Sequence, residues 1–309
     1  MEPVRRAVID VGTNSVKLLV ADVSGHNVRP LCETSKQTRL GQGFYQTHRL
    51  QAGPIADTAK AVADFAASAR EFHAVSIRVI ATSAAREALN ASELTSAIEQ
   101  ASGLKAEIIS GEQEADLVFR GATTGLQFTS VPLLLLEVGG GSTEFILGQG
   151  DRKDFSHSFP LGTVRLLEQL PRSDPPVASE LAACRRWLKE FLATEVRPRL
   201  EPALVGRQGV QLVGTGGTAS ILGCMEARLD KFDRERLEAT RLSLERLHWH
   251  AAHLWALPLE QRRQTVGLPK NRADVILTGV AIFEAVLELF AFSELRISTR
   301  GLRFAALLD

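Results

Sequence analysis

Acids and glycines recur in the same order at two places in the chain. Ile9-Asp10-Val11-Gly12-Thr13-Asn14-Ser15 and Leu136-Glu137-Val138-Gly139-Gly140-Gly141-Ser142 match at a constant offset, each between two apolar runs. Backbone N–H groups of a glycine-rich turn bind anionic oxygens, and a nearby carboxylate holds water or a metal ion. The pair predicts two phosphate loops that hold one phosphorylated ligand from both sides. The alternative is two ordinary hairpins whose glycines supply positive φ, but the repeated register favours a functional role.

A third glycine cluster, Gly214-Thr215-Gly216-Gly217-Thr218-Ala219, follows an apolar run and opens a predicted helix. Backbone amides at a helix N-terminus also bind anions. The spacing fits the dinucleotide-binding pattern, which requires a second strand that ends in an acid about twenty residues later. Residues 227–241 are instead charged and predicted to be helical, and the chain has no Gly-Lys dipeptide for a Walker loop. The cluster therefore predicts a phosphate contact outside both nucleotide-binding motifs.

Two further side chains suit phosphate hydrolysis. Glu114 lies in the first turn of a predicted helix that begins at Ser110-Gly111, and it is our candidate general base. Its alternative role is to complement the helix dipole, as acids in a first turn commonly do. Arg86 lies one turn into a helix that we expect Thr82 or Ser83 to cap, where it could clamp a phosphate. The alternative for Arg86 is a solvated helix residue.

Other kinds of site are disfavoured. His248 and His250 fall on different helix faces with no acid at ligand spacing, so we predict that they and His253 are surface residues. Cys32, Cys184 and Cys224 form no Cys-x-x-Cys pair, so we expect reduced thiols and no zinc site. The chain has no Gly-x-Ser-x-Gly elbow. Activation of water is therefore expected in place of a protein nucleophile.

Short β-type runs alternate with helical stretches, which predicts an α/β fold. The expected strands are Ala7–Val11, Val16–Asp22, Ser76–Ala81, Lys105–Ile109, Pro132–Val138, Glu144–Gly148 and Val210–Val213. The expected helices are Pro54–Phe72, Ala84–Gln100, Gln113–Gly121, Val177–Glu195, Leu244–Leu254 and Arg272–Phe290. Turn-type residues from Gly121 to Ser130 suggest a domain boundary.

Length and composition agree with this reading. The chain has 309 residues, enough for two domains, and its 45% hydrophobic and 23% charged residues are typical of a globular protein. Lys+Arg and Asp+Glu both number 36, which disfavours a nucleic-acid partner. No apolar run is long enough to span a membrane and no secretory segment is evident, so we expect a cytoplasmic protein.

The chain resembles the exopolyphosphatase and guanosine-pentaphosphate phosphohydrolase (Ppx/GppA) family of the actin/sugar-kinase/Hsp70 superfamily. The resemblance covers nearly the whole chain and also includes Arg272-Ala273-Asp274 and Gly301-Leu302-Arg303. Its main motifs, in chain order, are Asp10-Val11-Gly12-Thr13-Asn14-Ser15, Arg39-Leu40-Gly41-Gln42-Gly43, Ala81-Thr82-Ser83-Ala84-Ala85-Arg86, Ser110-Gly111-Glu112-Gln113-Glu114-Ala115, Glu137-Val138-Gly139-Gly140-Gly141-Ser142-Thr143-Glu144 and Gly214-Thr215-Gly216-Gly217-Thr218.

The resemblance implies two ribonuclease-H-like domains that flank an interdomain cleft. We expect residues 1–124, with a returning helix at about 300–309, to form the first domain and residues 125–299 the second. The implied catalytic residues are Glu114, Glu137 and Glu144, and the implied ligands of Mg²⁺ or Mn²⁺ are Asp10, Glu137 and Glu144. The expected phosphate contacts are Asp10, Gly12, Thr13, Asn14, Ser15, Lys17, Arg86, Gly139, Gly140, Gly141, Ser142, Gly214, Gly216 and Gly217.

Three positions depart from the family pattern. Glu137 stands where the family usually has Asp, Gln113 stands at a usually acidic position, and Phe304-Ala305 replaces a frequent Glu-Gly. The chain also lacks the His-Asp motif of long family members, which makes it a short form.

The expected function is hydrolysis of the terminal phosphate of inorganic polyphosphate, with guanosine pentaphosphate as a further substrate. In this hypothesis Glu114 activates water, and two Gly/Ser loops with Mg²⁺ hold the phosphates. A homodimer is expected because relatives often form one. The alternatives are a non-catalytic sensor of polyphosphate or guanosine tetra- or pentaphosphate, and an ATP-dependent kinase of the same superfamily.

Overall fold

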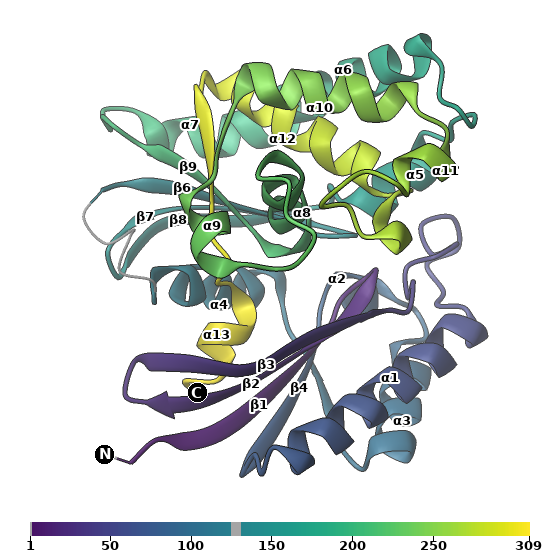
Figure 1. The fold of residues 1–309 in the computed structure, drawn as a ribbon, viewed down its shortest axis with the longest axis vertical. Coiled ribbons are helices and arrows are strands. Elements are labelled where there is room, and N and C mark those ends of the chain that lie inside the picture. The colour runs from purple at the N-terminus through teal and green to yellow at the C-terminus, as the bar shows by residue number, and fades with distance from the viewer. Residues whose placement is uncertain (1, 125–130) are drawn as a thin grey trace. The chain divides into compact units, whose positions relative to one another are not determined.

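A computed structural model describes residues 2–124 and 131–309 (Figure 1). The chain divides into two compact units. Unit 1 contains the chain up to residue 126 together with Arg300–Asp309, and unit 2 contains Gln127–Thr299. Among the described residues, no helix is both long enough and apolar enough to cross a membrane.

Unit 1 is built on a five-stranded mixed sheet of order β3-β2-β1-β4-β5. The strands β1, β2 and β3 are consecutive and antiparallel, whereas β4 and β5 run parallel to β1. Its elements are β1 (Val4–Val11), β2 (Ser15–Ser24), β3 (Asn27–Gln37), α1 (Ala52–Glu71), β4 (Ser76–Ala81), α2 (Ser83–Glu87), α3 (Ala91–Ser102), β5 (Ala106–Ile108), α4 (Gly111–Thr123) and α13 (Leu302–Ala306).

Both faces of β1 are buried. Ala7, Ile9 and Val11 pack with buried residues of α1 and α3 in one core. Val8, between them, is also buried and points to the opposite face because strand side chains alternate. The C-terminal helix α13 contacts β1 and lies beside α4 (Figure 1). Two buried faces explain why consecutive residues of β1, Ala7-Val8-Ile9, are all apolar.

The C-terminal segment is anchored in unit 1 at several points. Gly121 of α4 lies so close to the backbone of Gly301 that a Cβ atom at residue 121 would overlap the carbonyl of Gly301. The Arg303 guanidinium donates to the carbonyl of Leu18 at 2.8 Å. At the end of the chain, Arg120 pairs with the Asp309 side chain at 2.5 Å. The last ten residues are therefore an integral part of this unit.

Unit 2 is built on a six-stranded mixed sheet of order β10-β11-β9-β6-β7-β8. Its strands are β6 (Leu133–Val138), β7 (Thr143–Gln149), β8 (Arg152–Phe159), β9 (Gln211–Thr215), β10 (Arg241–Ser243) and β11 (Glu294–Ile297). Its helical elements are α5 (Thr163–Gln169), α6 (Ala178–Phe191), the π-helical turn η2 (Leu192–Val196), α7 (Arg197–Leu204), α8 (Gly216–Glu226), α9 (Arg234–Ala239), α10 (Leu244–Ala256), α11 (Leu259–Arg262), the 3₁₀ turn η3 (Lys270–Arg272) and α12 (Ile276–Phe290).

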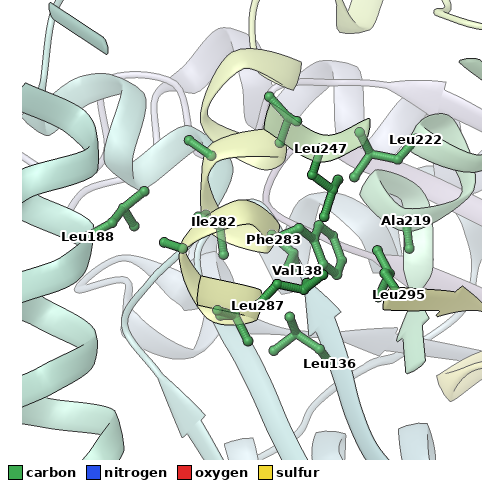
Figure 2. Packing of buried hydrophobic residues seen from close by; sticks show 14 of the residues in the cluster. Leu136, Val138, Leu188, Ala219, Leu222, Leu247, Ile282, Phe283, Leu287 and Leu295 are labelled. Carbon is green, nitrogen blue, oxygen red and sulfur yellow. The ribbon is translucent and has the colours of Figure 1, made fainter. Parts of the chain in front are cut away.

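Helix α12 forms the centre of the unit 2 core. Figure 2 shows Phe283 of α12 surrounded by side chains of the sheet and of neighbouring helices, including Val138 of β6 and Leu247 of α10. Twelve consecutive residues of α12, Ile276–Leu287, are buried. A helix that is apolar on all sides must be enclosed by other elements, and here the sheet, α6, α8 and α10 enclose it.

The two sheets share one topology. Reading β8-β7-β6-β9-β11 in unit 2 repeats the order β3-β2-β1-β4-β5 of unit 1, and β10 is an extra edge strand. In both units three antiparallel strands are followed by strands parallel to the first. The predicted α/β fold with two related units is confirmed, and the repeated motif opens corresponding hairpins, β1–β2 and β6–β7.

Two helix predictions were wrong in extent. The helix expected over 84–100 ends at Glu87 and restarts at Ala91, because the buried Asn90 side chain bonds both the N–H (2.8 Å) and the carbonyl (3.0 Å) of Leu50. Within residues 227–241 only Arg234–Ala239 is α-helical, capped by Asp233. Of the predicted boundary segment 121–130, residues 125–130 lie outside the described residues.

Candidate functional site

The first predicted phosphate loop connects β1 to β2 in unit 1. Gly12 N–H donates to the carbonyl of Ser15 at 3.1 Å, which closes the turn. The segment that follows β3 binds the loop through its backbone. The N–H groups of Thr38 and Arg39 donate to the Asn14 carbonyl, and that of Gly41 donates to the Thr13 carbonyl at 2.7 Å. The carbonyls of Thr13 and Asn14 are thus occupied by protein donors.

Two side-chain donors of this loop have no hydrogen-bond partner. The hydroxyl of Thr13 and the Nδ2 of Asn14 are buried and unbonded, and the two residues are only 3% and 5% exposed. A buried donor without a partner costs about 1–3 kcal/mol. That cost is removed when an acceptor occupies the loop, so these atoms favour binding of an anionic oxygen.

Glu114 and Arg86 form a buried ion pair in the same unit. Ser110 caps α4, and Gln113 completes a capping box with it, which fixes the first turn that carries Glu114. Glu114 is 8% exposed, and its Oε2 lies 2.8 Å from Arg86 Nη1. Arg86 Nη1 also donates to the Ile109 carbonyl at 3.1 Å. Arg86 is therefore oriented by α4 and by the segment before it. The alternative prediction, that Arg86 is a solvated helix residue, is wrong.

The expected side-chain cap of α2 is not formed. Thr82 occupies the cap position without a side-chain hydrogen bond, and the Ser83 hydroxyl donates to Glu87 at 3.0 Å instead. Backbone bonds take over this role, because Thr82 N–H donates to Val11 and Arg86 N–H donates to Thr82. The prediction of a side-chain cap was wrong, and Arg86 is held by tertiary contacts.

The pKa of Glu114 is raised above the ordinary value of a glutamate. Burial is the main cause, because the charged carboxylate is removed from water. The Arg86 guanidinium opposes this by attraction and hydrogen bonding. Asp10 raises the pKa further and Lys17 lowers it. A carboxyl with a raised pKa is a stronger base than a free glutamate once it is deprotonated, which suits proton abstraction from water.

Asp10 and Lys17 face each other across the β1–β2 hairpin. They are cross-strand partners in the register, and Lys17 Nζ lies 3.5 Å from Asp10 Oδ2. Both influence Glu114 electrostatically. Unit 1 therefore gathers Asp10, Lys17, Arg86 and Glu114 from four different elements, and its two cations could contact an anionic reactant beside the two carboxylates.

The second predicted loop connects β6 to β7 in unit 2 and repeats the turn of the first. Gly139 N–H donates to the carbonyl of Ser142 at 2.9 Å. Its carbonyls are bound by the start of α5, because Thr163 N–H donates to Gly139 and Val164 N–H to Gly140. The buried Arg165 side chain donates to Gly141 at 2.8 Å. As in unit 1, protein donors occupy the carbonyls of the loop.

Glu137 and Glu144 are direct cross-strand partners in this second hairpin. They occupy the register positions that Asp10 and Lys17 occupy in the first hairpin. Glu144 is 1% exposed and accepts a 2.7 Å bond from the Ser158 hydroxyl. An acid–lysine pair in unit 1 thus corresponds to two acids in unit 2, and like charges opposite one another are unfavourable unless a cation compensates them.

The third glycine cluster lies where β9 joins α8. Gly216 has φ +80°, and a Cβ atom there would lie 2.9 Å from Glu137 Oε1, so the glycine leaves room for this carboxylate. Gly217 is open, with no neighbouring atom within 4 Å of a Cβ. Gly214 packs against Phe283 in the core. This cluster is therefore adjacent to Glu137, and Gly214 has a packing role.

The surface prediction is wrong for His250. His250 is 3% exposed, and its Nε2 lies 2.7 Å from Glu226 of α8. The residues lie far apart in sequence, so spacing along α10 could not reveal this partner. His248 is partly exposed and pairs with Glu288 at 2.6 Å. Over the described ranges, no group of three or more His, Cys, Asp or Glu side chains is arranged to hold a metal ion, and all three cysteines are free.

Comparisons with known proteins agree with these observations. A family model described as the Ppx/GppA phosphatase family matches residues 19–309. An exopolyphosphatase 2 of Mycobacterium tuberculosis is 35% identical over 295 residues, which cover 91% of this chain and 89% of that protein.

Two solved structures share the fold. An Aquifex aeolicus member of the Ppx/GppA family has a TM-score of 0.79 and 28% identity, and the match covers 99% of this chain and 97% of that chain. An exopolyphosphatase from Cytophaga hutchinsonii has a TM-score of 0.88 and 27% identity, and the match covers 98% and 96%.

Proposed function

This chain belongs to the Ppx/GppA phosphatase family, and from that membership we propose that it hydrolyses the terminal phosphoanhydride bond of inorganic polyphosphate and releases orthophosphate. The observation that carries the proposal is the buried Glu114–Arg86 pair with its raised carboxyl pKa. In this pair, Glu114 could accept a proton from the attacking water, and Arg86 could bind a phosphate oxygen.

In the proposed reaction, a water oxygen attacks the terminal phosphorus and one proton of the water passes to the Glu114 carboxylate. The bridging P–O bond breaks, and the shortened polyphosphate leaves with the electron pair. Phosphoryl transfer depends mainly on positioning and on neutralisation of charge. In unit 1, Arg86, Lys17, and the donors of Thr13 and Asn14 would supply both.

We further propose that Mg²⁺ is held by unit 2. Mg²⁺ prefers oxygen ligands and often uses one or two carboxylates, with water and phosphate oxygens completing its coordination. The opposed Glu137 and Glu144 supply two carboxylates, and the space beside Gly216 leaves Glu137 room to take part. When bound, the ion would neutralise charge on the phosphate oxygens. Of the three expected metal ligands, Asp10 is the least favoured, because it is already paired with Lys17.

Guanosine pentaphosphate is a second proposed substrate. The sequence motifs resemble a family that includes guanosine-pentaphosphate phosphohydrolases, and the pentaphosphate ends in the same kind of phosphoanhydride as polyphosphate. The terminal phosphate would occupy the Glu114 site, whichever substrate carries it. Release of orthophosphate from the pentaphosphate at a rate comparable to that from polyphosphate supports this extension, and absence of release contradicts it.

The test of the main proposal is incubation of the purified protein with long-chain polyphosphate, with and without Mg²⁺. The expected products are orthophosphate and chains shortened from their ends, and EDTA should suppress their formation. Chains cut internally would contradict removal from the end. Tight binding of polyphosphate without release of phosphate would favour a sensor over a hydrolase.

A further inference from the structure

We propose that Gln37 is a positioning residue that orients the Asn14 amide toward the bound phosphate. This inference rests on the proposed function, because it concerns how the first phosphate loop presents its donors. Gln37 is the last residue of β3 and the cross-strand neighbour of Ser15 in β2. Its Nε2 donates to Asn14 Oδ1 at 3.1 Å.

The direction of this bond determines what Asn14 can offer a ligand. A primary amide has one accepting oxygen and one donating nitrogen. Because Gln37 occupies the oxygen, the nitrogen remains as the second polar atom of the side chain, and it is buried without a partner. With the amide turned over, Asn14 would present an oxygen to an anion, and the two would repel each other.

The backbone of the same segment supports this arrangement. The Asn14 carbonyl accepts from Thr38 and Arg39, and the Thr13 carbonyl accepts from Gly41. A side chain at residue 41 would overlap the Thr13 methyl group, so the glycine permits this close approach. Thr38 is itself held by a 2.9 Å bond from the Thr58 hydroxyl of α1. Gln37 therefore extends from a segment that is already fixed to the loop.

The test compares Gln37→Glu and Gln37→Met with the wild type. Glutamate has the shape of glutamine but accepts where glutamine donates, so Asn14 Nδ2 should turn toward it and leave the phosphate. Methionine removes the donor without adding charge. In Gln37→Glu, the hydrogen bond from Asn14 Nδ2 to the charged phosphate is lost. We expect KM for polyphosphate and the Kd for tripolyphosphate to rise about tenfold or more, with a smaller rise for methionine.

Two controls separate orientation from charge and from folding. In an Asn14→Ala background, Gln37→Glu should have little further effect, because the residue through which it acts is gone. Gln46→Glu adds the same charge at an exposed position shortly after this segment, and it should leave KM and Kd near the wild-type values. Thermal melting should show that each variant folds.

The outcomes decide the proposal. A tenfold loss of affinity that disappears in the Asn14→Ala background supports it. An equal loss in both backgrounds, or no loss in Gln37→Glu, overturns it. A wild type that binds tripolyphosphate but releases no phosphate contradicts the proposed hydrolysis, and the Kd values of the variants for tripolyphosphate still decide the role of Gln37. A wild type that does not bind tripolyphosphate overturns both.

Discussion

Glu114 is subject to two opposing influences on its pKa. Burial raises it, and the adjacent Arg86 guanidinium lowers it. As a general base Glu114 must be deprotonated, so kcat/KM should rise with pH through its pKa in the free enzyme. Since that pKa is raised, the acid limb of the pH profile should lie above the ordinary range of glutamate.

Replacement of Arg86 tests this balance. In Arg86→Gln the lowering influence is lost while burial remains, so the pKa of Glu114 should rise further. The acid limb of kcat/KM should move to higher pH, and the plateau should fall about 10-fold or more because a charged hydrogen bond is also lost. A pH–rate profile of both proteins measures the shift. A limb that stays in place would show that Glu114 is not the titrating base.

The sequence revealed these residues unequally. Glu114 and Arg86 each lie in a recognisable local motif, so the sequence alone singled them out. Gln37 and the Glu226 partner of His250 did not stand out, because their contacts join strands or helices that are distant along the chain. Such contacts are created by folding and leave no local spacing signal.

At the scale of elements, the second loop depends on the start of α5. Gly162 precedes this helix, and a Cβ atom there would overlap Gly140 and approach Gly141 N. Overlap with backbone cannot be relieved by rotation of a side chain. The position of the loop is therefore coupled to the position of α5.

Gly162→Ala should destabilise the protein by about 1–3 kcal/mol, as overpacking does, and should lower phosphate release because the loop must shift. Denaturant unfolding and the release assay measure the two effects. Gly53→Ala is the matched control, since Gly53 is exposed in the first turn of α1 with no atom near its would-be Cβ. The added methyl group favours the helix, whereas its contact with the ring of Pro54 opposes it, so the free energy of unfolding should change by less than about 1 kcal/mol. Equal behaviour of the two variants would refute the coupling.

The predicted strands were the apolar ones. The seven expected runs all correspond to strands, but β3, β8, β10 and β11 were missed. Of these, β3, β8 and β10 are edge strands, and β11 is a four-residue strand beside β10. In β3, five of the eleven residues are exposed. A strand that is half exposed to water does not need a continuous apolar run, so hydrophobic pattern alone does not reveal it.

At the scale of the whole molecule, the end of the chain completes unit 1. The close approach of Gly121 and Gly301 brings the backbones of α4 and α13 together. Gly121→Ala should separate them and cost about 2 kcal/mol or more. At that cost Tm should fall by about 4–8 °C for a unit of this size.

Thermal melting of Gly121→Ala, beside Gly53→Ala, tests this dependence. Limited proteolysis followed by mass spectrometry should show earlier cleavage near residue 300 in the Gly121 variant. An unchanged Tm together with unchanged cleavage would mean that the C-terminal segment is not needed for the stability of unit 1.

The repeated sequence motif correctly indicated that the two units begin with corresponding hairpins. The two hairpins match in turn geometry, with a 3.1 Å bond from Gly12 to Ser15 and a 2.9 Å bond from Gly139 to Ser142. What sequence pattern could not provide is the strand order, because β4 and β9 reach their places through long crossovers. Sequence pattern also did not show that Asp10 faces Lys17 while Glu137 faces Glu144, because this pairing follows from the strand register.

The most direct measurement is the rate of phosphate release from polyphosphate by Glu114→Gln, beside Glu112→Gln. Both substitutions remove a carboxylate from the first turn of α4, but Glu112 is exposed. Glutamine fills the same space but removes the counter-charge of Arg86, so stability should fall, and thermal melting must show that the variant is folded at the assay temperature. The rate should fall about 10²- to 10⁴-fold in Glu114→Gln and stay near wild type in Glu112→Gln. Retention of most of the wild-type rate in a folded Glu114→Gln protein would contradict the role proposed for this residue.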